Sequence, residues 1–223
     1  MRLVEKYRPK TFSDIIGQEK AVARIEALLK RGIGGRALLF EGPSGVGKTT
    51  TALVLARHLG IVRDNETLQV VQMGSNLDIR FYRAKEMDQR AVEELRDWLA
   101  LSNWQAPYKM VIIDEAQTMT KGATDALLSV LETLPERAVV ILTTTEAEAL
   151  QDDLFGRQTP FGSRCIQVSF VKPSNAEIAE RLVEIAFKEC GNGATLPYRE
   201  IVQEGKGNVR ACLQLLETAL VAR

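Results

Sequence analysis

The feature that most constrains this chain is the run Gly42-Pro43-Ser44-Gly45-Val46-Gly47-Lys48-Thr49, which has the spacing G-x-x-x-x-G-K-T. An apolar segment at 37–40 precedes it and an amphipathic segment follows it, as expected for a strand, a loop and a helix in succession. Glycines let backbone N–H groups converge on phosphate oxygens, and the next helix presents its positive end to the same oxygens. The spacing therefore predicts a nucleotide site that takes ATP with Mg²⁺.

Single residues of this loop have expected roles. Lys48 is expected to reach the β- and γ-phosphates, and Thr49 to be a ligand of Mg²⁺. A chance glycine-rich turn is the alternative, but it would not require a strand before it and a helix after it. The residues expected to bind the nucleotide here are Gly42, Pro43, Ser44, Gly45, Val46, Gly47, Lys48, Thr49 and Thr50.

Two carboxylates, Asp114 and Glu115, follow the apolar segment 110–113. In phosphate-loop enzymes an acidic residue at such a strand end holds Mg²⁺, often through water, and the next carboxylate can polarise the attacking water. The alternative is a pair of acidic residues favoured by a helix dipole. Because parallel strands end at one edge of a sheet, the catalytic interpretation is favoured beside a phosphate loop. We therefore expect an ATPase.

Short apolar runs alternate with amphipathic stretches before residue 171, which predicts an α/β fold with a five-stranded parallel sheet. Lys172-Pro173 ends this pattern, and Ser174 with Glu177 has the spacing of a helix capping box. We expect an α/β domain at 1–170 and a small all-α lid domain at 171–223. The predicted strands are 37–40, 69–73, 110–113, 138–142 and 166–170.

Composition restricts the wider class of protein. Lys plus Arg and Asp plus Glu number 29 each, so the net charge is zero and any basic surface must be local. Cys165, Cys190 and Cys212 lie far apart, which argues against a zinc module or a disulfide framework and indicates reduced, buried thiols. No apolar run approaches the ~20 residues of a membrane span, and 1–5 lacks a signal-peptide core. We expect a cytoplasmic protein with no membrane partner, from a bacterial or phage-infected cell.

Segment 3–18 resembles the opening of AAA+ clamp-loader ATPases, the family of the bacterial gamma/tau subunit and of the replication factor C small subunit. The resemblance runs through nearly the whole chain and implies the AAA+ fold of that family. Its other matching segments are 114–119 (second nucleotide motif), 125–132 (the following helix of gamma/tau), 142–145 (sensor 1), 163–165 (Ser-Arg-Cys motif) and 207–210 (sensor 2).

The resemblance implies roles for further residues. Thr145 would sense the γ-phosphate, Arg164 would reach the ATP site of a neighbouring subunit, and Arg210 would contact phosphate within its own subunit. A surface salt bridge for Arg164 and an exposed helix charge for Arg210 are the alternatives. Because the linker before Ser163 is longer than usual for the family, Arg157 is the second candidate for the trans arginine. The implied adenine pocket comprises Val4, Tyr7, Arg8, Pro9 and Ile16.

The chain combines a phosphate loop, Glu115 and a trans arginine, so copies of it can build complete sites, and we expect a homo-oligomeric ring or open spiral. It ends just after the lid, where typical members continue into a helical collar, and it lacks the zinc module of gamma/tau. We expect either a shortened chain or a reduced loader-like ATPase, for which a phage or another mobile element would be a plausible source.

Segment 74–90 departs from the family pattern, because it interleaves basic and aromatic residues that can bind phosphates and stack on bases. Phe81-Tyr82 could instead dock on a partner, or the segment could be a solvated loop and helix face with its aromatics in the core. We expect His58 to be structural rather than catalytic, and Trp98 and Trp104 to be packing residues. The candidate DNA contacts are Arg80, Arg83, Arg90, Arg96 and Lys121.

The leading functional expectation is a clamp loader or loader-like replication factor that acts on primed or forked DNA, with a sliding clamp as a further partner. A helicase of the DEA-box type, suggested by 114–117, would need a second ATPase lobe that does not fit in 223 residues. The alternative left open is an ATP-regulated scaffold or helicase-loader-like protein that recruits replication or repair partners.

Overall fold

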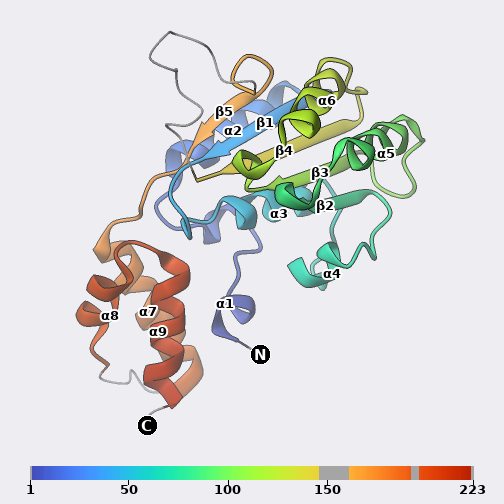
Figure 1. Cartoon of the computed structure of the whole chain (residues 1–223). Helices are drawn as coiled ribbons and strands as arrows, with labels where there is room; N and C mark the ends of the chain where they lie inside the picture. The colour runs from blue at the N-terminus through green and yellow to red at the C-terminus, as the bar shows by residue number, and fades with distance from the viewer. Residues whose placement is uncertain (1, 146–160, 192–195, 222–223) are drawn as a thin grey trace.

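The computed structural model describes residues 2–145, 161–191 and 196–221 of the 223-residue chain. Five parallel strands form one sheet in the order β2-β3-β4-β1-β5, which confirms the predicted α/β fold with a five-stranded parallel sheet (Figure 1). The strands are β1 (Arg36–Glu41), β2 (Ile79–Arg83), β3 (Lys109–Asp114), β4 (Ala138–Thr144) and β5 (Ile166–Ser169).

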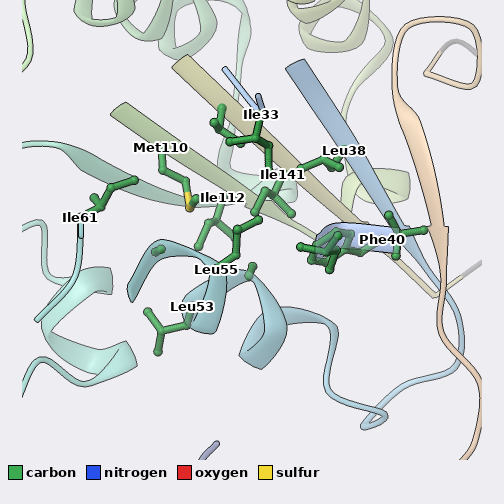
Figure 2. Close-up of a cluster of buried hydrophobic side chains, with 14 of the residues drawn as sticks. Ile33, Leu38, Phe40, Leu53, Leu55, Ile61, Met110, Ile112 and Ile141 are labelled. Atoms are coloured by element: carbon green, nitrogen blue, oxygen red, sulfur yellow. The ribbon is translucent and has the colours of Figure 1, made fainter. Parts of the chain in front are cut away.

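Apolar side chains leave both faces of the sheet, because successive residues of a strand point to opposite sides. On β1, Leu38 and Phe40 join the core beneath α3, and Leu39 joins the core on the opposite face. Figure 2 shows the first of these cores, in which Ile112 and Ile141 of neighbouring strands face Leu55 of α3. Each such fully buried side chain stabilises the fold by about 1.5–3 kcal/mol. The covering helices are α2 (Glu19–Arg31), α3 (Lys48–His58), α5 (Gln89–Ala100) and α6 (Lys121–Glu132).

The strand order determines where the polar strand ends meet. β1 lies between β4 and β5, and β3 lies on the other side of β4. Because all five strands are parallel, the loop after β1, Asp114 of β3 and the last threonines of β4 lie at one edge of the sheet. The fold therefore gathers residues that lie far apart in sequence, since Thr49 is 65 positions from Asp114 and Asp114 is 29 positions from Thr143.

The predicted strand at 69–73 is wrong. Residues Leu68–Gln72 form a short helix, α4, which begins at Thr67, whose hydroxyl accepts the N–H of Val70. The second strand of the sheet is instead β2, within segment 74–90, whose interleaved basic and aromatic residues include candidate DNA contacts. An apolar run this short has no period that separates a helix from a strand. Gly74, at φ 72°, suits the end of a helix rather than the end of a strand.

Three helices form a separate lid beside the sheet, coloured orange to red in Figure 1: α7 (Asn175–Cys190), α8 (Tyr198–Gly205) and α9 (Val209–Val221). The predicted capping box is confirmed, since the Ser174 hydroxyl accepts the Glu177 N–H and the Glu177 carboxylate accepts the Ser174 N–H. The three helices share one apolar core.

The N-terminal helix α1 (Leu3–Lys6) packs on the lid and not on the sheet. Leu3 is buried in the lid core, and its N–H donates to the carboxylate of Glu217 on α9 at 3.2 Å. The short helical turn Phe12–Asp14 lies back against α3 of the α/β part. Residues 3–7 therefore pack on the lid although they lie outside the predicted lid domain at 171–223. The domain boundary between residues 170 and 171 stays a prediction. The other short turns are Ala84–Glu86 and Ala116–Thr118.

Two expectations about packing are wrong. Cys165 and Cys212 are buried, but Cys190 at the end of α7 is exposed. Trp98 packs in the core, whereas the side chain of Trp104 is 71% exposed. The backbone N–H of Trp104 donates to the carboxylate of Asp78 at 2.7 Å, so its main chain is anchored while its indole faces solvent. Within the described part of the chain, no helix is both long enough and apolar enough to cross a membrane.

Candidate nucleotide site

Three glycines give the phosphate loop its shape. Gly42, Gly45 and Gly47 have φ values of 141°, 76° and 108°, which residues with a Cβ rarely adopt. A Cβ at Gly42 would overlap the carbonyl of Phe170, and one at Gly45 would overlap the side-chain amide of Asn208. The loop is therefore packed against both the linker to the lid and the start of α9.

The ammonium of Lys48 is held inside this loop. The residue is buried, and its Nζ donates to the carbonyl oxygens of Gly42 and Pro43, each at 2.6 Å. Loss of solvation lowers the pKa of Lys48 to about 8, the nearby carboxylates of Asp114 and Glu115 oppose that shift, and the charge of Arg210 adds to it. A cation that is already desolvated and aimed by the loop is suited to bind phosphate oxygens.

The carboxylate of Asp114 is fixed by two hydroxyls. Its Oδ1 accepts from Thr49 Oγ1 at 2.9 Å and from Thr143 Oγ1 at 2.6 Å. Thr49 belongs to the first turn of α3 and Thr143 to β4, so the carboxylate ties the phosphate-loop helix to the central strand. A threonine hydroxyl beside a carboxylate is a donor set that suits Mg²⁺, and these residues fit that ion.

Glu115 and Thr145 both contact or adjoin the short turn after β3: Glu115 directly precedes it, and Thr145, which follows β4, is bonded to its Gln117. Glu115 has φ 59°, an unusual conformation for a residue other than glycine, and its N–H donates to Thr143 Oγ1 at 3.1 Å. Thr145 Oγ1 accepts from Gln117 Nε2 at 2.9 Å, while Gln117 Oε1 is buried without a hydrogen-bond partner. The turn thus connects the residues expected to activate water and to sense the γ-phosphate.

The loop and both strand ends open into one cleft with an empty volume of about 930 Å³, open solvent included. Its other end is apolar and comes from the N-terminal segment and from α9, which suits a base and fits ATP. The structure brings together all five residues of the expected adenine pocket. The cleft is lined by Val4, Tyr7, Arg8, Pro9, Ile15, Ile16, Ser44, Gly45, Val46, Gly47, Lys48, Thr49, Thr50, Asp114, Glu115, Thr143, Thr145, Val209, Arg210 and Leu213.

The N-terminal segment is held at the cleft by polar contacts. Arg8 Nη1 donates to Thr50 Oγ1 at 2.9 Å, and Arg8 Nη2 forms an ion pair with Glu5 Oε1 at 2.6 Å. The hydroxyl of Tyr7 donates to Glu189 of α7, which also pairs with Lys6 at 2.7 Å. Arg8 therefore connects the phosphate-loop helix to α1, and α1 is connected to the lid.

Arg210 reaches the cleft from the first turn of α9. Asn208, two residues before Arg210, accepts the N–H of Ala211 with its side-chain oxygen at 3.0 Å and so caps this helix. The positive charge of Arg210 also contributes to the lowered pKa of Lys48.

Arg164 is not among the residues that line the cleft. Its Nε and Nη2 contact Glu132 Oε1 at 2.7 and 2.6 Å, at the end of α6. This ion pair is the surface salt bridge given above as the alternative for Arg164. A place outside its own cleft is also what an arginine acting on a neighbouring subunit requires, so that role stays a prediction. The other candidate, Arg157, lies outside the described residues.

The five candidate DNA contacts are not brought together with the cleft. Arg80 stacks on the ring of Trp98 at 4.8 Å and donates to the hydroxyl of Tyr82. Phe81 and Tyr82 pack against the cores on opposite faces of the sheet, as the alternative with buried aromatics expects. Lys121 is an exposed residue at the start of α6, and the remaining arginines pair with acids close in sequence: Arg83 with Glu86, Arg90 with Glu94 and Arg96 with Asp97.

Several functional candidates escaped the sequence reasoning. Thr143 stands two residues before Thr145 at the same strand end, which was the available signal. For Gln18, the sequence offered no signal of a role other than its place in segment 3–18. Gln18 is almost fully buried, its Nε2 donates to Val171 O at 2.6 Å and to Val46 O at 3.4 Å, and its Oε1 accepts the Val171 N–H at 3.1 Å. Gln18 therefore joins the lid linker to the phosphate loop.

Comparison with known proteins agrees with this geometry. The family described as "DNA polymerase III, delta subunit" matches residues 17–173. The replication factor C small subunit of Methanothermobacter thermautotrophicus is 31% identical over 223 residues, which cover 97% of this chain and 62% of that protein. The DNA polymerase III subunit gamma/tau of Mycobacterium tuberculosis is 29% identical over 231 residues, 99% of this chain and 39% of that protein. The chain thus spans less than two thirds of the length of these relatives.

Solved structures share the fold at lower identity. The RuvB Holliday junction branch migration motor of Thermotoga maritima has a TM-score of 0.66 at 20% identity, covering 95% of this chain and 64% of that one. A DNA polymerase III gamma subunit-related protein from the same organism has a TM-score of 0.56 at 16% identity, covering 88% and 58%. Because the family match takes in the phosphate loop, both strand-end carboxylates and more than half of the chain, this protein belongs to the AAA+ clamp-loader family described as the DNA polymerase III delta subunit.

Proposed function

We propose that this chain is an ATP-hydrolysing subunit of clamp-loader type whose sites become complete only between subunits. One observation carries the proposal: Lys48, Thr49, Asp114 and Arg210 converge on a single cleft, while Arg164 lies outside it. A site with its own phosphate-binding residues and an arginine directed elsewhere is suited to work in an assembly.

The chemistry follows from the residues at the polar end of the cleft. Lys48 and the backbone N–H groups of the loop bind the phosphates, and Arg210 adds a second cation. Thr49 and Asp114 would hold Mg²⁺, which would neutralise charge on the transferred phosphoryl group. Glu115 orients and polarises the attacking water.

The named relatives suggest the partners. They are a replication factor C small subunit and a DNA polymerase III gamma/tau subunit, so the proposed setting is DNA replication in the cytoplasm of a bacterial or phage-infected cell. We infer that copies of the chain assemble around primed or forked DNA in a ring or spiral, and that a sliding clamp is the further partner. Arg164 of one copy would neutralise charge at the site of the next copy.

The test is ATPase activity measured with and without primed DNA, for the wild-type chain and for Glu115→Gln. We expect DNA to stimulate the wild-type rate and Glu115→Gln to bind ATP but hydrolyse it at least about 100-fold more slowly. Equal rates with and without DNA would count against an action on DNA. Recruitment of replication partners by Glu115→Gln at the wild-type level would favour the ATP-regulated scaffold instead.

A further inference from the structure

The hydroxyl of Thr143 makes two different hydrogen bonds at the centre of the nucleotide site. It donates to Asp114 Oδ1 at 2.6 Å and accepts the backbone N–H of Glu115 at 3.1 Å. Thr143 is 1% exposed, so solvent does not replace either bond. A hydroxyl has one proton to donate, and here that proton goes to the carboxylate expected to hold the metal.

The first bond determines which oxygen of Asp114 stays available. Thr49 and Thr143 both donate to Oδ1, which leaves Oδ2 for a metal ion or its bound water. A carboxylate held by one donor can rotate about its Cβ–Cγ bond, whereas two donors on the same oxygen fix its plane. Residues that orient metal ligands in this way typically change metal affinity or activity by about 10–100-fold when removed.

The second bond acts on the backbone of Glu115. This residue has φ 59°, a conformation that costs free energy for any residue with a Cβ. The hydrogen bond from its N–H to Thr143 Oγ1 offsets part of that cost and fixes the direction in which the Glu115 side chain leaves the turn. One hydroxyl on β4 thus orients both strand-end carboxylates.

We propose that Thr143 is the positioning residue that aligns Asp114 for the metal and Glu115 for the water. This inference rests on the proposed function. A valine at this position keeps the β-branched shape that suits the strand and replaces the hydroxyl by a methyl group. Loss of the hydroxyl frees Asp114 Oδ1 from one donor and leaves the Glu115 N–H without its acceptor.

The experiment compares two matched pairs of side chains in the full chain: threonine with valine, and serine with alanine. Each pair differs by the hydroxyl, and Thr143→Ser and Thr143→Ala share the loss of the methyl group. Ile141→Val, on the same face of β4, is the control for a lost methyl group in the core. Affinity for a fluorescent ATP analogue is measured with and without Mg²⁺, beside kcat, KM and thermal unfolding.

Mg²⁺ should increase the affinity for the ATP analogue about tenfold less, or by a still smaller factor, in Thr143→Val and Thr143→Ala than in the wild type. We expect kcat of both variants to fall by about tenfold or more as well. Thr143→Ser and Ile141→Val should stay within about threefold of wild type, and affinity without Mg²⁺ should be equal in all variants. If valine prevents folding, the comparison of serine with alanine decides the question.

Equal Mg²⁺ dependence and kcat in the hydroxyl-bearing and hydroxyl-free variants would overturn the role of Thr143. A wild-type chain that binds ATP without hydrolysing it would instead contradict the proposed function. Nucleotide affinity with and without Mg²⁺ would then still test Thr143, because that measurement does not depend on turnover.

Discussion

At the scale of single residues, the site holds two groups in states that are unfavourable in themselves. Lys48 is a cation removed from solvent, and Glu115 has a backbone conformation usually left to glycine. Both are held in place by neighbours: two carbonyls bind the ammonium, and a threonine hydroxyl binds the Glu115 N–H. Such costs are common where a site is arranged for a ligand before it binds.

The lowered pKa of Lys48 predicts that ATP binding takes up protons. At pH 8, near that pKa, about half of the free protein carries a neutral Lys48, and phosphate oxygens favour the ammonium. We expect uptake of about half a proton per nucleotide at pH 8 and almost none at pH 6.5. Calorimetry in buffers of different ionisation enthalpy measures this uptake, and the same titration at pH 6.5, where Lys48 is already protonated, is the control. Binding heats at pH 8 that do not depend on the buffer would show that the pKa is not lowered.

Because of its surroundings, Gly45 should not tolerate even the single methyl group of alanine. A Cβ there would overlap Asn208 and would sit on a backbone with φ 76°, so the Asn208 side chain has to leave its position as the cap of α9. We expect Gly45→Ala to lower the free energy of unfolding by about 1–2 kcal/mol and to weaken ATP binding. Denaturant unfolding and nucleotide titration test both effects.

Gly122→Ala is the matched control for this change. Gly122 lies in α6 with nothing within 4 Å of an added Cβ, so we expect it to be neutral or to stabilise by up to about 1 kcal/mol. Equal behaviour of the two alanine variants would mean that the contact between Gly45 and Asn208 has no energetic importance.

At the scale of elements, the linker between β5 and α7 is held by specific contacts. Gln18 uses both polar atoms of its side-chain amide on Val171 and reaches Val46 in the phosphate loop. A Cβ at Gly17 would overlap Pro173, so the chain before Gln18 approaches the linker closely. The linker before α7 is therefore held against the phosphate loop through Gln18.

Gln18→Leu is expected to weaken that connection while keeping a side chain of similar size. It leaves the N–H and carbonyl of the exposed residue Val171 without their partner, which should cost about 0.5–1.5 kcal/mol of unfolding free energy. Hydrogen exchange at the Val171 amide should become faster than in the wild-type chain. Gln203→Leu, on an exposed position of α8, is the control, and unchanged protection at Val171 in Gln18→Leu would contradict the role of Gln18.

The buried strands could be predicted from the sequence, whereas the edge strand β2 and the short helix α4 could not. The buried strands β1, β3 and β4 were predicted because they are continuous apolar runs between two covered faces. β2 is an edge strand that mixes arginines with aromatics, and α4 is an apolar run too short to show a period. The strand predicted at the position of α4, and the missing prediction of β2, therefore have one cause: apolar periodicity does not identify short segments or mixed edge strands.

At the scale of the whole molecule, the trans role of Arg164 predicts complementation between two inactive variants. Lys48→Ala removes phosphate binding in its own subunit, and Arg164→Ala removes the arginine given to the neighbour. In an equal mixture, up to about a quarter of the interfaces pair an intact Lys48 with an intact Arg164 of the next copy. We expect ATPase activity in the mixture to exceed that of either variant alone.

The measurement is steady-state ATPase of each variant and of the mixture at one total concentration, with sedimentation to follow assembly. Arg164→Lys serves as a further variant, since it keeps the charge but not the planar donor geometry. A strictly monomeric chain whose ATPase is unaffected by Arg164→Ala would rule out composite sites.

The sequence by itself determined the features that depend on local chemistry. The spacing from Gly42 to Thr49 predicted the phosphate loop, the apolar run before Asp114 predicted the second acidic motif, and the residues Ser174 and Glu177 predicted the start of α7. Each of these depends on residues close together in the chain, where backbone conformation and hydrogen bonding are set by the neighbours.

Only the tertiary structure decided which distant residues meet. It placed Thr143 between Asp114 and Glu115, Gln18 between the lid linker and the phosphate loop, and α1 on the lid rather than on the sheet. These contacts arise from the order of parallel strands and from packing between segments more than a hundred residues apart, as with Leu3 and Glu217. Local spacing carries no record of such pairings, because they follow from how the whole chain buries its apolar surface.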